Sequence, residues 1–158
     1  MDKSVKPYLF LLTAFAAVIG LYLYRPFNLY FLADDFLHIP ESAKNIWLQR
    51  NSLRPIGNIS LHIDYWFSNK NALGYHITNL LLHITNTWLV FIFSKLLFTK
   101  FVIDKTNFLP ILISVFFFTY PFHSESVFWI IGRSGSLGSL FFLVAMIGFL
   151  KKEQSFFY

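Results

Sequence analysis

Four long runs of apolar residues alternate along the chain with stretches that hold most of its charges. The apolar runs cover about residues 7–24, 76–98, 108–120 and 127–150. A helix needs roughly 20 mostly apolar residues to cross the hydrocarbon core of a bilayer, and fewer where flanking side chains reach the headgroups. The pattern therefore predicts an all-α, polytopic integral membrane bundle with about four transmembrane helices, of which the third is short.

The first run, PYLFLLTAFAAVIGLYLY, has two interpretations. The triplet AFA at residues 14–16 is an acceptable signal-peptidase site, but the apolar run continues well beyond it. This continuation favours an uncleaved signal anchor over a cleaved signal peptide.

The stretch between the first and second runs, residues 25–75, is rich in aromatic residues and patterned. Pro40 stands directly before ESAKNIWLQR, and proline is favoured in the first turn of a helix. After Pro55, the apolar residues recur at the spacing of an amphipathic helix, namely Ile56, Ile59, Ile63 and Trp66. We predict two amphipathic helices in the membrane interface, with Asn58 and His62 facing water. The alternative is that these helices only cap the bundle.

Composition agrees with a membrane protein: 56% of the residues are hydrophobic, 13% are charged, and the mean hydropathy is +0.54. The absence of cysteine excludes disulfides, thiolate nucleophiles and cysteine-ligated metals. The net charge of +5 is scattered along the chain, so it indicates topology and not a nucleic-acid-binding patch. With cytoplasmic N- and C-termini, most of the lysines lie on the cytoplasmic side, with Lys44 and Lys70 as the exceptions, in agreement with the positive-inside rule. Residues 25–75 then lie on the periplasmic or lumenal side.

Polar residues form one stripe on the second run. His76, Asn79, His83 and Asn86 step by three, four and three residues, which places them on one helix face. His76 and His83 are separated by roughly 10 Å along a helix, too far for two ligands that each lie about 2 Å from one zinc ion. The stripe therefore predicts hydrogen bonding between packed helices.

The stretch FFFTYPFHSESVFWIIGRSGSLGSLFF joins the third and fourth runs. Pro121 is expected to end the third helix, a short turn follows, and the fourth helix is expected to begin at Val127. Arg133 would then lie shallow enough to extend its side chain outward to the membrane surface. The small residues around it favour either close helix packing or the approach of a phosphate to the backbone; they are Gly132, Ser134, Gly135, Ser136, Gly138 and Ser139. The His-x-Glu of a zinc deaminase is excluded, since that motif needs downstream cysteines.

Asp34 and Asp35 form an acidic pair between apolar residues. Adjacent carboxylates at a membrane surface raise each other's pKa and can hold a divalent cation or act as a base. A cap at a loop end, or a solvated turn, is the alternative.

Taken in order, these motifs resemble the N-terminal module of the GT-C glycosyltransferases. The likeness is greatest to the transmembrane O-mannosyltransferases that carry tetratricopeptide repeats, and to their bacterial relatives. It covers about residues 34–149 and is carried by the Asp pair, LRPIGNISLHIDYWF, GYHITNLLLHITN, YPFHSESVFWIIGR and the Gly/Ser-rich fourth run. The resemblance implies transfer of a sugar from a polyprenyl-phosphate donor to a hydroxyl acceptor, on a protein or glycan, at the non-cytoplasmic face.

The resemblance also implies roles for individual residues. Asp34 and Asp35 would be the catalytic pair, and they could hold Mg²⁺ or Mn²⁺. Arg54 and Arg133 would bind the lipid phosphate, while His123 and Glu125 would shape or protonate the site.

The chain is shorter than such enzymes and shows no internal repeat, so residues 1–158 are interpreted as one transmembrane module. It would be a fragment of a longer enzyme, one half of a split enzyme completed by a second membrane subunit, or a small membrane protein. Two other classes stay open: a noncatalytic subunit that docks a larger membrane partner, and a lipid or ion transporter. A transporter needs ionisable groups near the bilayer midplane, where the chain offers only the histidines of the second run.

Overall fold

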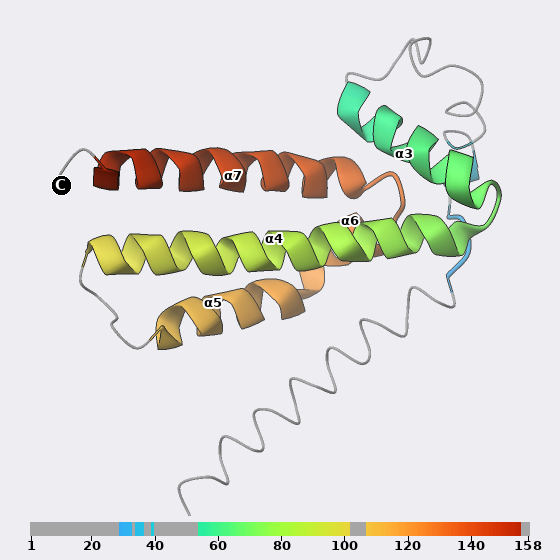
Figure 1. Ribbon diagram of the computed structural model, residues 1–158. Coiled ribbons are helices and arrows are strands. Elements are labelled where there is room, and N and C mark those ends of the chain that lie inside the picture. Colours follow the sequence, from blue (N-terminus) through green and yellow to red (C-terminus); the bar gives the residue numbers. More distant parts are fainter. Residues whose placement is uncertain (1–28, 33, 37–38, 40–53, 102–106, 156–158) are drawn as a thin grey trace, which may run out of the picture.

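The computed structural model describes residues 29–32, 34–36, 39, 54–101 and 107–155. In this part of the chain the regular elements are helices, and no strand is present (Figure 1). They are α3 (Pro55–Ser68), α4 (Ala72–Lys100), α5 (Phe108–Thr119), the 3-10 turn η2 (Pro121–His123), α6 (Ser124–Phe128) and α7 (Arg133–Ser155). The predicted all-helical fold class is confirmed.

Two of these helices are long and apolar enough to cross a bilayer. They are α4, with 29 residues, and the part of α7 from Arg133 to Lys152, with 20 residues. Helix α5 has 12 residues, so it extends over only about 18 Å and is shorter than the hydrocarbon core. The predicted first span, residues 7–24, and the interface helix after Pro40 lie outside the described residues. The count of about four spans therefore stays a prediction.

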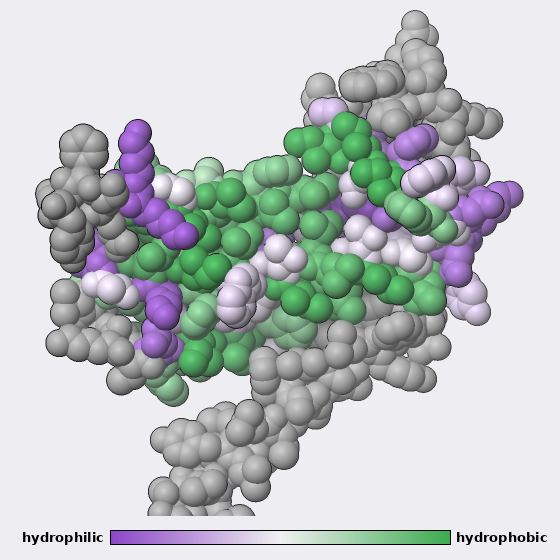
Figure 2. Space-filling model, viewed as in Figure 1, coloured by the Kyte–Doolittle hydropathy of each residue, from purple (hydrophilic) through white to green (hydrophobic). Residues whose placement is uncertain are grey.

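Helix α4 lies between α5 and α7 (Figure 1). Two residues of its polar stripe contact these neighbours, His83 at Phe118 of α5 and Asn86 at Ser136 of α7. α4 and α7 run in the same direction and α5 runs the opposite way. Large apolar side chains point outward from this layer, including Leu81, Trp88, Phe116, Phe142 and Phe149. In Figure 2 a hydrophobic surface covers the middle of the layer, and hydrophilic residues gather at its two ends. Such a contiguous apolar surface is expected where lipid or another protein is the neighbour.

The predicted fourth helix is interrupted. Helix α6 ends at Phe128, Trp129 has an extended backbone, and α7 begins at Arg133. A Cβ atom at Gly132 would lie 2.4 Å from the carbonyl oxygen of Glu125, so the chain turns back on itself in a space that only glycine fits. The prediction of one helix from Val127 is therefore wrong, whereas the end of α5 just before Pro121 agrees with its prediction.

Helix α3 begins at Pro55 and has the predicted spacing, but the surroundings of its polar face differ from the prediction. Its apolar face is exposed, with Trp66 78% accessible, and Asn58 and Asp64 are buried against the other helices. The expectation that Asn58 faces water is wrong, because the polar face of this helix has partners inside the protein. Figure 1 shows α3 crossing the end of the layer where α4 and α7 begin.

Candidate functional site

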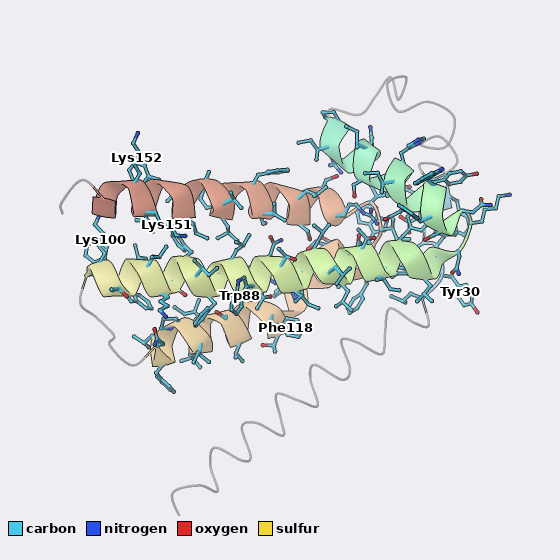
Figure 3. The ribbon with its side chains drawn as sticks, in the orientation of Figure 1. Tyr30, Trp88, Lys100, Phe118, Lys151 and Lys152 are labelled. Carbon is cyan, nitrogen blue, oxygen red and sulfur yellow. The ribbon has the colours of Figure 1, made fainter. Side chains whose placement is uncertain are left out.

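Buried polar side chains collect where α3 crosses the start of α4 and of α7, at the right-hand end of Figure 3. We call this group the polar cluster. Its members come from four segments far apart in the sequence: Asp35, Asp64, His76, Asn79 and Arg133. In a protein interior such groups require hydrogen-bond or charged partners, so their contacts define what the cluster can do.

Arg133 is the centre of the cluster and is 0% exposed. Its Nη1 forms a salt bridge with the carboxylate of Asp64 and donates to Oγ of Ser60 at 3.0 Å. Its Nη2 donates to the carbonyl oxygen of Tyr75 at 3.1 Å. The expectation that Arg133 extends outward is wrong, because both Nη atoms of its guanidinium have partners inside the protein.

Asp64 is the functional residue that sequence reasoning missed. Its Oδ2 binds Arg133, and its Oδ1 accepts a hydrogen bond from Oγ1 of Thr78 at 2.8 Å. A signal was present: Ser60 and Asp64 stand four residues apart, on the side of the helix away from the apolar stripe. A carboxylate there predicts a buried cation, but the sequence does not say which one.

The structure separates the two members of the acidic pair. Asp34 is exposed, and Asp35 is fully buried. Oδ2 of Asp35 accepts from the backbone N–H of Leu32 at 2.9 Å, and Oδ1 accepts from that of Ile131 at 3.3 Å. Burial raises the pKa of Asp35, while these hydrogen bonds and the nearby His76 oppose the shift. Burial, and not the neighbouring carboxylate, is therefore the leading cause.

The polar stripe of α4 is buried along its length. Nδ2 of Asn79 donates to the carbonyl oxygens of Val127 and Trp129 at 3.3 and 3.1 Å. A ring nitrogen of His83, Nε2, lies 3.0 Å from the carbonyl oxygen of Phe118, and Nδ2 of Asn86 donates to that of Ser136 at 2.8 Å. These bonds join α4 to α5, to the α6–α7 turn and to α7, as expected for polar contacts between packed helices. His76, the first member, is close enough to Asp35 and Arg133 to interact electrostatically.

The other predicted site residues lie outside the cluster. His123 is partly buried, its Nδ1 lies 2.9 Å from the carbonyl oxygen of Phe117, and its ring is 5.5 Å from that of His83. Glu125 and Arg54 are exposed, and Arg54 stands just before the first turn of α3. Within the described segments, no hydrogen bond or salt bridge joins these three side chains to Asp34 or Asp35.

Metal ligands are sparse in the described segments, which contain no group of three or more His, Asp or Glu residues placed to hold an ion. Asp35 is enclosed, with both of its oxygens bound to backbone N–H groups. Asp34 is the member of the pair that is open to a ligand.

A groove of about 480 Å³ lies between α4 and α5. Its lining is almost wholly apolar and includes Trp88, Phe91, Ile111 and Phe118 (Figure 3). A groove of this kind has no charged group that could recognise a sugar or a phosphate, so the polar cluster is the better candidate site.

Curated proteins similar to this chain are protein O-mannosyl-transferases. Human TMTC2 is 31% identical over 100 residues, which are 63% of this chain and 11% of the relative. Human TMTC3 is 27% identical over 120 residues, 76% of this chain and 12% of the relative. Tmtc1 of Drosophila melanogaster is 28% identical over 118 residues, 75% of this chain and 13% of the relative. No protein-family model and no solved structure matches the chain.

The resemblance to the transmembrane O-mannosyltransferases is thus confirmed. The chain spans only between 11% and 13% of the length of these three relatives.

Proposed function

We propose that the chain is part of a membrane glycosyltransferase that moves a sugar from a polyprenyl-phosphate donor to a hydroxyl acceptor on a protein or glycan. The observation that carries this proposal is its similarity to protein O-mannosyl-transferases of vertebrates, an insect and a nematode over 100 to 120 residues. The arrangement of the acidic pair is compatible with this chemistry.

Glycosyl transfer to a hydroxyl requires a group that accepts the hydroxyl proton near the anomeric carbon. Asp35 has the proton affinity for this role, because burial raises its pKa and so makes its carboxylate a better proton acceptor. Its carboxylate is 0% exposed, so the acceptor hydroxyl would have to displace the residues packed over it to come within hydrogen-bond reach. The departing lipid phosphate requires positive charge. Arg54, exposed at the start of α3, is available for it, whereas Arg133 is bound to Asp64.

A divalent cation, Mg²⁺ or Mn²⁺, would bind at the exposed Asp34 and not between the two carboxylates. Mg²⁺ sites commonly combine one or two protein carboxylates with phosphate oxygens of the substrate. The ion would supply positive charge to the leaving phosphate. Asp34 would orient it, and the enclosed Asp35 would keep its hydrogen bonds to Leu32 and Ile131.

The charges at the two ends of the helical layer support a site on the non-cytoplasmic face. Lys100, Lys151 and Lys152 lie together at one end, and Tyr30, four residues before Asp34, lies at the other (Figure 3). Lysines next to membrane spans favour the cytoplasmic side. The acidic pair would then face the periplasm or a lumen, and His123 and Glu125 stay candidates for shaping the site.

Sugar transfer by the single variants Asp34→Asn and Asp35→Asn tests the proposal. Membranes that contain the chain are supplied with polyprenyl-phosphate mannose, and transfer to protein is measured by the mannose label. We expect at least a roughly 100-fold loss in the Asp35 variant, the usual effect of removing a general base, and a loss in the Asp34 variant as well. Lys70→Gln, an exposed change outside the cluster, serves as the matched control. Transfer that survives in both aspartate variants rules out the proposal.

A noncatalytic subunit is the second candidate, and the exposed face of α7 favours it. A Cβ atom at Gly135, Gly138 or Gly148 would meet nothing within 4 Å, which leaves room for a further helix to pack closely. Such a subunit needs no aspartate chemistry. Both aspartate variants would then support a larger partner's activity normally, whereas Gly138→Leu would prevent the partner from co-purifying.

A further inference from the structure

The turn at residues 129–132, between α6 and α7, contacts Asp35, which lies far away in the sequence. The backbone N–H of Ile131 donates to Oδ1 of Asp35 at 3.3 Å across 96 residues of sequence. The other bond to this carboxylate, from Leu32 at 2.9 Å, is local. Among the described residues, the Ile131 bond therefore ties Asp35 to the helical layer.

Helix α4 holds one side of this turn. Nδ2 of Asn79 donates to the carbonyl oxygens of Val127 and Trp129, which lie before and within the turn. Gly132 lies against the carbonyl oxygen of Glu125, so the turn has little freedom to move toward α6.

Arg133 holds the other side, since it directly follows the turn. Its guanidinium binds α3 through Asp64 and Ser60, and α4 through the carbonyl oxygen of Tyr75. Helix α3 also approaches the start of α7 closely: a Cβ atom at Gly57 would lie 2.7 Å from Oγ of Ser134. The guanidinium of Arg133 thus joins α7 to α3 and α4 at the residue that directly follows the turn.

We infer that Arg133 and Asp64 are a positioning pair: their salt bridge fixes the 129–132 turn so that the N–H of Ile131 stays bound to Asp35. No hydrogen bond or salt bridge joins the pair to Asp35 within the described residues; besides the charge of Arg133, which Asp35 senses at a distance, the link between them is the turn, so the pair positions Asp35 without being catalytic. The importance of Asp35 for catalysis rests on the proposed function, whereas the link from the pair to Asp35 is a property of the fold.

Hydrogen exchange at the Ile131 amide tests this link without requiring turnover. The full chain in lipid nanodiscs is compared with the double variant Asp64→Asn/Arg133→Gln, which removes both charges of the salt bridge together. We expect exchange at Ile131 to become about tenfold faster, the scale of one lost hydrogen bond. Asn86→Leu is the matched control, because it removes a different α4–α7 bond, to Ser136, and should leave Ile131 unchanged.

A double-mutant cycle with Asp35→Asn separates positioning from general loosening. Once Asp35 is replaced, the bond from Ile131 is already weakened, so the double change at Asp64 and Arg133 should accelerate exchange little further. Purely additive effects, or unchanged exchange in a folded double variant, overturn the inference. If the double variant does not fold, Arg133→Lys keeps the charge but lacks the fork, and unchanged Ile131 exchange in that variant overturns the inference equally. None of these outcomes depends on sugar transfer, so the two proposals can fail separately.

Discussion

Asp34 and Asp35 show how much the environment of a residue decides beyond its type. The two carboxylates are adjacent, yet one is exposed and the other is enclosed with both oxygens bound to backbone N–H groups. An exposed carboxylate can bind a cation or a substrate, while an enclosed one has an altered proton affinity. The structure therefore favours two separate roles over a shared one: Asp34 would bind the ligand, and Asp35 would accept the proton.

The raised pKa of Asp35 predicts how the free energy of unfolding depends on pH. An acid whose pKa lies above its ordinary value of 3.8 in the folded state binds its proton more tightly there than in the unfolded chain. Its contribution to stability is fully present below about pH 4 and is lost as the pH rises through the folded-state pKa. We therefore compare the melting temperature of the wild type with that of Asp35→Asn at each pH. The difference, wild type minus variant, should fall as the pH rises from about 4 through the folded-state pKa of Asp35, and should then become constant.

Thermal unfolding in detergent with EDTA measures this difference, and subtracting the variant removes the contribution of the other titrating groups. A difference that grows with pH would mean that the hydrogen bonds from Leu32 and Ile131 outweigh burial, so that the pKa of Asp35 is lowered and not raised.

At the scale of elements, local patterns in the sequence predicted where the helices lie. They did not predict side-chain orientations that depend on a partner far away in the sequence. The apolar spacing after Pro55 predicted α3, and the step of three, four and three predicted the buried stripe of α4. Neither pattern indicates that Asp64 binds Arg133, 69 residues away. The inward orientation of both side chains therefore became visible only in the structure. The break before α7 was missed for the same reason, because it is held by Asn79 of α4.

Gly132 gives a prediction for the turn between α6 and α7. In Gly132→Ala the new Cβ would meet backbone oxygens, 2.4 Å away at Glu125 and 3.1 Å away at Trp129, and a backbone atom cannot rotate aside. We expect a destabilisation of about 1–3 kcal/mol, typical of overpacking. Gly138→Ala is the matched control: its Cβ has open space, so helix propensity should stabilise α7 by up to about 1 kcal/mol. Denaturant unfolding of both variants checks the contrast, and equal effects would contradict the role given to the turn.

In the described part of the chain, a group of buried polar side chains lies beneath an exposed apolar surface. Arg133, Asp64 and the stripe of α4 are buried, while the large apolar side chains of α4, α5 and α7 are exposed between two hydrophilic ends (Figure 2). This is the arrangement that a bilayer favours, because hydrocarbon replaces water as the neighbour of the outer surface. Composition and hydropathy were sufficient to predict this class. Composition and hydropathy do not determine the number of spans. The apolar run that forms α5 gives a helix of only 12 residues, which is too short to count as a span by length alone.

Topology is the whole-molecule property on which the placement of the site depends. The chain has no cysteine, so one introduced thiol reports the side on which it lies. Sealed vesicles carrying Lys70→Cys, Lys100→Cys or Lys152→Cys are treated with a membrane-impermeant maleimide from one side at a time. Lys70 precedes α4, Lys100 ends it, and Lys152 ends the apolar part of α7. We expect labelling of Lys70→Cys from the non-cytoplasmic side, and of the other two from the cytoplasmic side.

The control is Trp88→Cys, which lies midway along α4 on its exposed apolar face and should react from neither side. Labelling of Lys70→Cys and Lys100→Cys from the same side would mean that α4 does not cross the bilayer, and the acidic pair would lose its assigned face. Labelling of Lys70→Cys from the cytoplasmic side and of Lys100→Cys from the other side would mean that α4 crosses the bilayer but that Asp34 and Asp35 lie in the cytoplasm. A polyprenyl-phosphate sugar presented on the outer face could not then be their substrate.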